Sequence, residues 1–364
     1  MAEPHVAVVG AGITGLFTAL HHKRRFPAHR VAVLERGPHP SGASVKNAGF
    51  ACFGSPSEIL ADIDAEGADA AIARVEERWQ GLCELRGELG DDRIGFEASG
   101  GHEVFAEGDV LYTRVASRFD ELNRLLFPVF GVPVYEWRDG AERNLGLRAG
   151  PIAFTALEGA VDSGQLMRTL LDKVREAGVD VRFRHAVTAV EDNGVGVDLA
   201  VDGLGTLRAG QVVIATNGYA GELLPGICVK PARGQVLLTA PIAGLRLKGT
   251  FHADEGYFYF RDHLGGVLLG GGRHLDKAGE TTTEDALTPL IQDALERLLR
   301  DTILPGQPFT IAHRWSGVMG FRDHGKTALM ERVLPRVVVA AGLSGMGVAI
   351  GIRVAKRAAA LLAE

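Results

Sequence analysis

Three glycines near the start of the chain have the spacing of a dinucleotide-binding turn. Gly10, Gly12 and Gly15 follow the apolar run HVAVV and open a stretch in which apolar residues recur with helical spacing. Such glycines let the backbone turn tightly and approach a pyrophosphate, whose charge the helix N-terminus stabilises. Glu35 ends the next apolar run, where it would accept hydrogen bonds from ribose hydroxyls. The pattern predicts a dinucleotide site, with a ligand-free glycine turn as the alternative.

A second glycine turn lies near the other end of the chain, in VVVAAGLSGMGVAIG. Gly342, Gly345 and Gly347 separate a buried-strand pattern from a final helical stretch. A helix N-terminus at this place would face the pyrimidine edge of a flavin, where negative charge develops on reduction. Taken alone, this turn fits simple packing glycines equally well. Together the two turns favour FAD over NAD, because an extended FAD molecule needs protein contacts at both of its ends.

The composition limits what else the protein binds. The chain has 364 residues, 23% of them charged, and a formal net charge of -6. Because a basic patch marks binding to nucleic acid or anionic lipid, we expect neither as a main partner. No apolar run reaches the ~18 residues that span a bilayer. Three separated cysteines, Cys52, Cys83 and Cys228, suggest neither a disulfide framework nor a metal site and fit a cytoplasmic location.

The hydrophobic pattern predicts the elements that position the first turn. Residues 5–9 and 30–35 read as strands on either side of a helix over 13–25, so they form a βαβ unit with parallel strands. Residues 37–57 are rich in Gly, Ser and Pro and are expected to form a long functional loop. Residues 58–90 have helical periodicity.

The rest of the chain changes pattern twice. Residues 91–150 are mixed and rich in turns, which suggests an excursion into another domain. The segment VDSGQLMRTLLDKVREAG predicts an amphipathic helix, and short strands in series follow it up to IATNG. Alternation with period two over 229–274 predicts antiparallel strands. A helix is expected over 284–302, before a last strand and the closing helix.

With these motifs in this order, the sequence resembles the D-amino acid oxidase superfamily of flavoenzymes. The resemblance rests on the glycine fingerprint with Glu35, the loop SGASVKNAGF, the segments VDSGQLMRTLL and IATNGYA, and the closing AAGLSGMG. It covers nearly the whole chain. The chain is most similar to the glycine oxidase and sarcosine oxidase branch, whose members oxidise a C–N bond of an amino acid or secondary amine. Members with covalent flavin carry a cysteine in the segment equivalent to WSGVMGF, and its absence here implies noncovalent FAD.

The resemblance also implies the fold class and the domains. We expect a mixed α/β protein with a Rossmann-like FAD-binding domain on a parallel sheet and a substrate domain on an antiparallel sheet. The FAD-binding domain is expected to be discontinuous, over residues 1–80, 151–225 and 310–364. The substrate domain is expected over residues 81–150 and 226–309.

A set of cofactor contacts follows from the resemblance and the glycine pattern. Ser44 would lie near the pyrophosphate, Ala48, Gly49 and Phe50 near the flavin ring, and Val187 would meet the adenine through its backbone. Each has an ordinary loop or strand-end role as its alternative. The predicted contacts are Gly10, Gly12, Ile13, Thr14, Gly15, Glu35, Arg36, Ser44, Asn47, Ala48, Gly49, Val187, Ala215, Thr216, Gly218, Gly317, Gly342, Ser344, Gly345, Met346 and Gly347.

The substrate anchor departs from the family pattern. Glycine oxidase-like proteins carry substrate-binding arginines at the positions that read Met319 and Gly345 here. Arg273, in LLGGGRH, is the candidate for the carboxylate anchor, because a guanidinium fork gives two parallel charge-assisted hydrogen bonds. A solvated surface arginine is the alternative. Tyr257 matches a family tyrosine that hydrogen-bonds substrate, and Tyr259 shares its face of a strand.

Other side chains have weaker support. They are Lys46 in the flavin loop, and His274, His313 and Arg314. For the two tyrosines, a core aromatic stripe is the alternative.

The function expected from the resemblance is oxidation of an amine or amino acid by FAD. Oxygen would be reduced to hydrogen peroxide, and the imine product would hydrolyse to a 2-oxo acid such as glyoxylate. Phe50, Tyr257, Tyr259 and Met319 suggest room for an apolar group, which favours an N-substituted glycine such as an N-carboxymethyl amino acid of secondary metabolism. A 2-hydroxy acid oxidase or dehydrogenase and a flavin-holding subunit without turnover are the alternatives. The sequence leaves the oligomeric state open.

Overall fold

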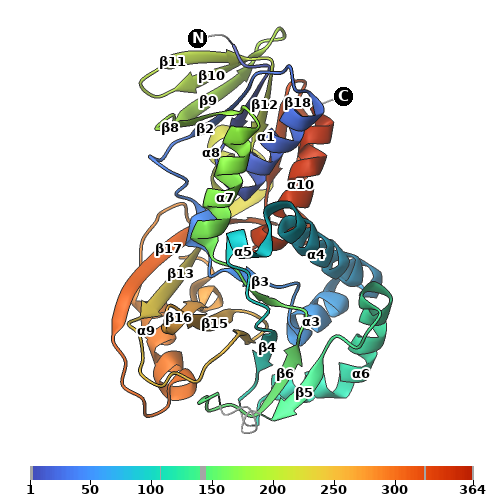
Figure 1. Cartoon of the computed structure of the whole chain (residues 1–364), viewed down its shortest axis with the longest axis vertical. Coiled ribbons are helices and arrows are strands. Elements are labelled where there is room, and N and C mark those ends of the chain that lie inside the picture. The colour runs from blue at the N-terminus through green and yellow to red at the C-terminus, as the bar shows by residue number, and fades with distance from the viewer. Residues whose placement is uncertain (1–2, 107, 140–144, 324, 363–364) are drawn as a thin grey trace.

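The computed structural model describes residues 3–106, 108–139, 145–323 and 325–362. Figure 1 shows a parallel sheet with helices α1, α7 and α10 at one end of the molecule and a larger sheet with α9 at the other. Both chain termini lie at the first end. The predicted mixed α/β architecture is confirmed.

The first sheet is built around the predicted βαβ unit. Its strand order is β18-β19-β12-β1-β2-β8, and all neighbouring pairs are parallel except β18 with β19. Every residue of β1, β2 and β19 is buried, as in parallel sheets covered on both faces. The strands are β1 (Val6–Val9), β2 (Val31–Glu35), β8 (Asp180–Phe183), β12 (Gln211–Ile214), β18 (Leu329–Leu334) and β19 (Val337–Ala341).

Different layers cover the two faces of this sheet. One face packs against α1 (Ile13–Arg25), α4 (Ala68–Leu89), α7 (Ser163–Glu176) and α10 (Gly347–Leu361). Helices α4 and α10 approach so closely that a Cβ on Gly81 would lie 1.9 Å from the carbonyl oxygen of Ala349. The other face packs against α8 (Ala220–Leu223) and a small sheet of β9 (Val187–Asp192), β10 (Val197–Val201) and β11 (Gly205–Ala209).

The second large sheet confirms the antiparallel strands predicted over 229–274. Its order is β17-β13-β16-β15-β14-β4-β6-β5, and only β14 with β4 is parallel. The strands are β4 (Gly101–Val104), β5 (Glu136–Asp139), β6 (Pro151–Thr155), β13 (Val229–Thr239), β14 (Thr250–Ala253), β15 (Phe258–His263), β16 (Gly266–Gly271) and β17 (Ile311–Arg322). Strands β6 and β17 belong to this sheet, although the predicted boundaries gave both to the FAD-binding domain. The division into domains itself stays a prediction.

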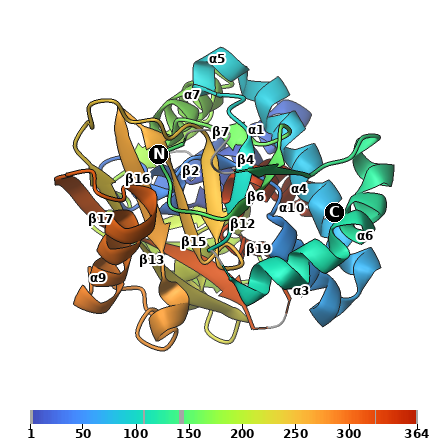
Figure 2. The ribbon, with the colours of Figure 1, turned by 90° about the horizontal axis from the view of Figure 1, so that it is seen from below.

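Helices flank this sheet, as the view from below shows (Figure 2), with α9 on one side of the strands and α3 and α6 on the other. They are α3 (Pro56–Glu66), α6 (Val110–Phe130) and α9 (Pro289–Leu298), which is followed by the π-helical turn η3 (Leu299–Ile303). The short helix α5 (Asp91–Ile94) packs instead against α7 and α4. The short elements are α2 (Ala43–Lys46), β3 (Phe50–Ala51), β7 (Gly159–Ala160), η1 (Asn217–Tyr219) and η2 (Arg273–Asp276).

Three expectations need correction. The turn-rich stretch 91–150 contains the long helix α6, which begins after Asp109, whose carboxylate accepts a hydrogen bond from the amide of Leu111. The loop over 37–57 contains α2 and β3. The helix expected from residue 284 begins only at Pro289, because Glu284 and Thr288 before it are hydrogen-bonded to side chains of β13. Among the described residues, no helix is long and apolar enough to cross a membrane.

Candidate functional site

A cavity of about 700 Å³ lies between the two large sheets. Its wall brings together the ends of β1 and β2, the loop around α2, the start of α10, and the facing side of the eight-stranded sheet. Both predicted glycine turns therefore border the same space, although more than three hundred residues separate them in the chain.

The first turn has the close approaches that its glycines predict. Gly10 has φ +106°, and its amide donates to the carbonyl of Leu34 over 2.8 Å. A Cβ on Gly15 would lie 2.0 Å from the carbonyl oxygen of Gly10, so α1 packs directly on the turn. The amide of Ile13 donates to Ser44 Oγ over 3.0 Å. A Cβ on Gly12 would lie 2.9 Å from that same hydroxyl oxygen.

Glu35 is held beside this turn by backbone amides. Its carboxylate accepts from the amides of Ala11 and Gly37, each over 3.0 Å, and the residue is 8% exposed. The next residue, Arg36, places its guanidinium 3.9 Å from the ring centroid of Tyr219. The end of β2 therefore presents an anchored carboxylate and a cation to the cavity.

The second turn joins β19 to α10. The amide of Gly342 donates to Asn217 Oδ1 over 3.0 Å, and Ser344 and Gly345 both have positive φ. The N-cap residue Met346 makes no side-chain hydrogen bond to the helix. The start of α10 thus brings backbone amides to the cavity wall, as expected for contact with an electron-rich ligand edge.

A buried arginine fixes the loop between the two sheets. Arg261 Nη1 donates to the carbonyls of Gly49 and Val161 over 2.9 and 3.0 Å. Asn47 shapes the same loop, because its Nδ2 donates to the Ser44 carbonyl over 2.8 Å and its Oδ1 accepts from the Gly49 amide over 2.8 Å. The sequence did not indicate Arg261, because a buried arginine on a strand cannot be told from a solvent-exposed one by sequence pattern.

The cavity wall suits a nucleotide cofactor. The hydroxyls of Thr14 and Thr216 are buried without a hydrogen-bond partner in the described part of the chain, and both residues line the cavity. Buried hydroxyls are normally hydrogen-bonded, so these two indicate a missing polar ligand. With the amides of two helix N-termini and the anchored Glu35, the donor and acceptor set fits a dinucleotide.

Most of the predicted cofactor residues line this cavity. Four do not: Gly15, Gly49, Gly218 and Gly342 lie behind the wall, where a Cβ on Gly218 would be 2.3 Å from the carbonyl oxygen of Met319. Those that line it are Gly10, Gly12, Ile13, Thr14, Glu35, Arg36, Ser44, Asn47, Ala48, Val187, Ala215, Thr216, Gly317, Ser344, Gly345, Met346 and Gly347. Their individual contacts with a cofactor stay predictions.

Comparison with known proteins identifies the family. A family model described as FAD dependent oxidoreductase matches residues 5–361. The chain belongs to the FAD dependent oxidoreductase family. The family is FAD-dependent, which agrees with the dinucleotide-like cavity wall.

Individual relatives of the family resemble the chain to different extents. An N-methyl-L-tryptophan oxidase of Yersinia pestis (strain Pestoides F) is 37% identical over 81 residues, which span 22% of this chain and only 21% of that relative. A glycine oxidase from Geobacillus kaustophilus is similar in fold, with TM-score 0.78 and 21% identity over 100% of this chain and 95% of that one. An L-proline dehydrogenase from P. horikoshii has TM-score 0.78 and 18% identity over 99% and 93% of the two chains.

Aromatic residues form the wall on the side of the eight-stranded sheet. His252 and Tyr259 are opposite each other on β14 and β15. The ring of Phe50 meets both edge-on, with centroid distances of 5.1 Å to His252 and 5.8 Å to Tyr259. Burial raises the pKa of Tyr259 to about 12, so its hydroxyl stays protonated. Sequence reasoning missed His252, because a lone histidine in a strand is usually a core residue.

Arg273 lies in the cavity wall just after β16, at the start of η2. Its guanidinium lies 4.5 Å from the ring centroid of Phe321, and no carboxylate among the described residues pairs with it. Burial lowers its pKa from the usual value, but an arginine remains charged at neutral pH. Tyr257 lies beside it and is 42% exposed, with its ring 4.5 Å from that of His274.

The two positions where the family pattern has arginines lie next to each other here. A Cβ on Gly345 would lie 3.8 Å from Met319 Sδ. Both residues line the cavity, so this part of the wall carries no cation of its own. The two positions that lack the family's substrate-binding arginines therefore form one apolar patch, made of Met319 and Gly345.

The other candidates either have partners or lie outside the cavity wall. Lys46 Nζ contacts the carboxylate of Asp285, and Arg314 contacts Gln292 and Glu296. His313 is exposed on β17, outside the cavity wall. His274 Nε2 lies 3.1 Å from Asp254 Oδ2 and is also outside that wall. Arg273 is thus the better placed of the candidates.

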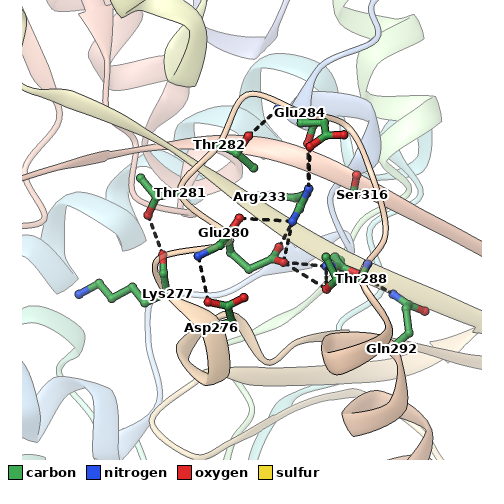
Figure 3. Close-up of polar contacts among 12 residues, drawn as sticks. Arg233, Asp276, Lys277, Glu280, Thr281, Thr282, Glu284, Thr288, Gln292 and Ser316 are labelled. Carbon is green, nitrogen blue, oxygen red and sulfur yellow. Dashed lines mark hydrogen bonds and ion pairs between the residues drawn. The ribbon is translucent and has the colours of Figure 1, made fainter.

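A buried ion pair holds the segment that follows Arg273. Arg233, on β13, donates twice to the carboxylate of Glu280, over 2.9 Å in each case, and the side chains are 4% and 1% exposed. Figure 3 shows Thr288 and Gln292 beside this pair. Because η2 leads directly into this anchored segment, the backbone that carries Arg273 is fixed at both ends.

Helix α3 contributes charged residues that sequence reasoning missed. Glu58 and Asp62 line the cavity, and Lys326 Nζ reaches them over 3.2 and 2.7 Å. Glu58 also pairs with Arg78 over 3.2 Å. Burial raises the pKa of Glu58, but Arg78, Lys326 and His252 outweigh it and hold this pKa at about 2. Charged residues on an amphipathic helix look like a solvated face in the sequence.

Proposed function

We propose that the protein oxidises the C–N bond of a glycine-like or N-substituted amino acid, such as an N-carboxymethyl amino acid. When bound, FAD would supply the two-electron oxidation of the substrate, with oxygen as the final acceptor that is reduced to hydrogen peroxide. The imine product then hydrolyses to a 2-oxo acid such as glyoxylate. The observation that carries this proposal is Arg273, a cavity-lining guanidinium with no carboxylate partner among the described residues.

The residues around the cavity have separable roles in this proposal. Arg273 binds the substrate carboxylate, because a buried carboxylate without a countercharge is strongly disfavoured. Phe50 and Tyr259 exclude water beside the reacting carbon, and the apolar patch of Met319 and Gly345 accepts an alkyl part of the substrate. The anchored Glu35 and the two glycine turns hold the cofactor without a covalent bond.

The relatives support the substrate class. An N-methyl-L-tryptophan oxidase, a glycine oxidase and an L-proline dehydrogenase all take their names from amino acids. The first and the third of these named compounds are secondary amines, which fits an N-substituted substrate. The shared fold does not by itself assign this substrate, because folds host many activities.

Turnover in air tests the proposal. The FAD-loaded protein is mixed with glycine, N-alkylglycines, N-carboxymethyl amino acids and the matching 2-hydroxy acids, and hydrogen peroxide and 2-oxo acids are measured. We expect both products from at least one amine and from none of the hydroxy acids. Products from hydroxy acids alone would support the alcohol-oxidising alternative. No change in flavin absorbance with any compound would support a flavin-holding subunit.

A further inference from the structure

A polar corner lies in the cavity wall between α3 and the loop after β14. A Cβ built on Gly256 would lie 3.7 Å from Glu58 Oε2 and 3.7 Å from His252 Nδ1. The two atoms are therefore at most twice this distance apart and lie in the same corner of the wall. All three residues line the cavity, so a ligand there can reach the corner.

Neither side chain of the corner is satisfied within the described residues. His252 is 8% exposed, and neither ring nitrogen has a hydrogen-bond partner among the described residues. Nε2 is fully buried, and Nδ1 is the nitrogen at the corner. Glu58 uses only one carboxylate oxygen, because Arg78 and Lys326 both donate to Oε1, each over 3.2 Å. Oε2 has no donor in the part of the chain that the structure describes. Oε2 and Nδ1 are therefore polar atoms that no protein donor occupies, and they are available to a donor group on a ligand.

The corner suits a nitrogen that stays protonated. Glu58 is ionised at neutral pH, because its pKa is held at about 2. Burial lowers the pKa of His252 to about 4, against the opposite effect of Glu58, so the imidazole is neutral and one of its nitrogens is an acceptor. A carboxylate and a neutral imidazole together stabilise a cation with N–H donors. The nitrogen that is oxidised must instead be neutral, so it is not the one held here.

We propose that Glu58 and His252 bind a second, cationic nitrogen of the substrate, distinct from the nitrogen that is oxidised. The substrate is then an amino acid or N-carboxymethyl amino acid whose side chain ends in an ammonium or guanidinium group. Phe50, whose ring meets that of His252 edge-on, packs against the aliphatic stem. The inference rests on the proposed function, because it takes Arg273 as the anchor of the substrate carboxylate.

Binding to the FAD-loaded protein tests the corner without any turnover. The probes are straight-chain ω-amino acids of three to six carbons and the plain carboxylic acids of the same lengths, and the signal is the change in the visible flavin spectrum. We expect at least one ω-amino acid to bind about tenfold or more tightly than its matched acid, because a charged hydrogen bond is worth that much. Glu58→Gln and His252→Phe should each remove most of this preference and leave the binding of plain acids unchanged.

Two variants make the outcome specific. His252→Phe keeps the Arg78–Glu58 ion pair intact, so it tests the corner even where Glu58→Gln fails to fold. Glu255→Gln is the matched control, because Glu255 lines the same cavity but its carboxylate already lies 3.1 Å from Arg114. It should keep the preference.

The results separate this inference from the proposed function. The inference is wrong if ω-amino acids of every length bind no more tightly than their matched acids. It is also wrong if Glu255→Gln loses the preference for ω-amino acids to the same extent as the other two variants. Arg273→Ala should weaken both series of probes to a similar extent. If both series bind Arg273→Ala as tightly as the parent, the carboxylate anchor of the proposed function is wrong, whatever the corner does.

Discussion

The carboxylate of Glu35 accepts a hydrogen bond from the backbone amide of Ala11 over 3.0 Å, and this bond ties the end of β2 to the glycine turn before α1. A second bond from the amide of Gly37 holds the other carboxylate oxygen over 3.0 Å. The turn is therefore shaped by the protein itself, and Glu35 has lone pairs left for a ligand in the cavity.

Glu35→Gln should weaken FAD binding by about tenfold or more. The change removes the charge from two charge-assisted hydrogen bonds and turns one acceptor into a donor that opposes a backbone amide. Titration of the apoprotein with FAD, followed by flavin fluorescence, measures the effect. Glu331→Gln, on β18 and outside the cavity wall, is the control and should bind like the parent. Equal affinity in Glu35→Gln would remove this residue from the cofactor site.

Gly12→Ala should also impair FAD binding, for a steric reason. A Cβ at this position would lie 2.9 Å from Ser44 Oγ, and we expect it to obstruct the pyrophosphate as well. Adding Ser44→Ala relieves the first clash but not the second. We therefore expect the double variant to remain defective in the same titration. Full recovery of FAD affinity in the double variant would place the pyrophosphate elsewhere.

Local sequence patterns were sufficient for the cofactor end of the site. The first glycine turn, the strand that ends at Glu35 and the start of α10 are each specified within about twenty residues, and the structure brings them to one cavity. Arg273, the predicted carboxylate anchor, also lies in the cavity wall, in η2 just after β16.

The corner at Gly256 was not predictable from local patterns. Glu58 reads as the solvated face of an amphipathic helix, and His252 as a core residue. Only the pairing of β14 with β15 and the packing of α3 bring these two side chains to the same point. Lys326 was not predictable for the same reason, because its contacts with Glu58 and Asp62 join α3 to a loop that is far away in the sequence.

The contribution of Glu158 to the stability of the fold should fall as the pH rises between about 5 and 8. Glu158 accepts from the amides of Phe53 and Gly54 over 2.8 and 3.2 Å, but burial raises its pKa to about 8. The folded chain therefore keeps a proton that the unfolded chain loses above its usual pKa of 4.5. Since this carboxyl binds more protons in the folded state over this range, its titration lowers the free energy of unfolding by up to about 1.4 kcal/mol per pH unit.

Glu158→Gln tests this pH dependence. Glutamine keeps an uncharged acceptor for the two amides and removes the titration. The free energy of unfolding of the variant should therefore decrease less with rising pH than that of the parent. Urea unfolding at several pH values, with excess FAD present, measures the slope. Glu103, whose pKa burial raises to about 7, acts in the same direction, and His252, whose pKa burial lowers to about 4, acts in the opposite direction. The test is therefore the difference in slope between parent and variant. Identical slopes in parent and variant would contradict the assignment.

The flavin should separate from the protein on denaturation. The segment where covalent relatives carry a cysteine has none here. Cys52 lines the cavity, but burial raises the pKa of its thiol well above the usual value, so little reactive thiolate forms. Acid precipitation followed by absorbance of the supernatant at the flavin band measures release. Flavin that remains with the precipitated chain would show a covalent bond.

Anaerobic reduction of the flavin by an amine substrate, compared between the parent and Arg273→Ala, tests the central claim most directly. Loss of the buried partner of a carboxylate costs ~2–5 kcal/mol, so half-maximal bleaching should need roughly 30-fold more substrate or higher. Flavin content and the visible spectrum should not change, and Arg273→Lys should recover part of the loss, since an ammonium lacks the planar fork. If Arg273→Ala is bleached at the same substrate concentrations as the parent, Arg273 does not hold the carboxylate and the account is wrong.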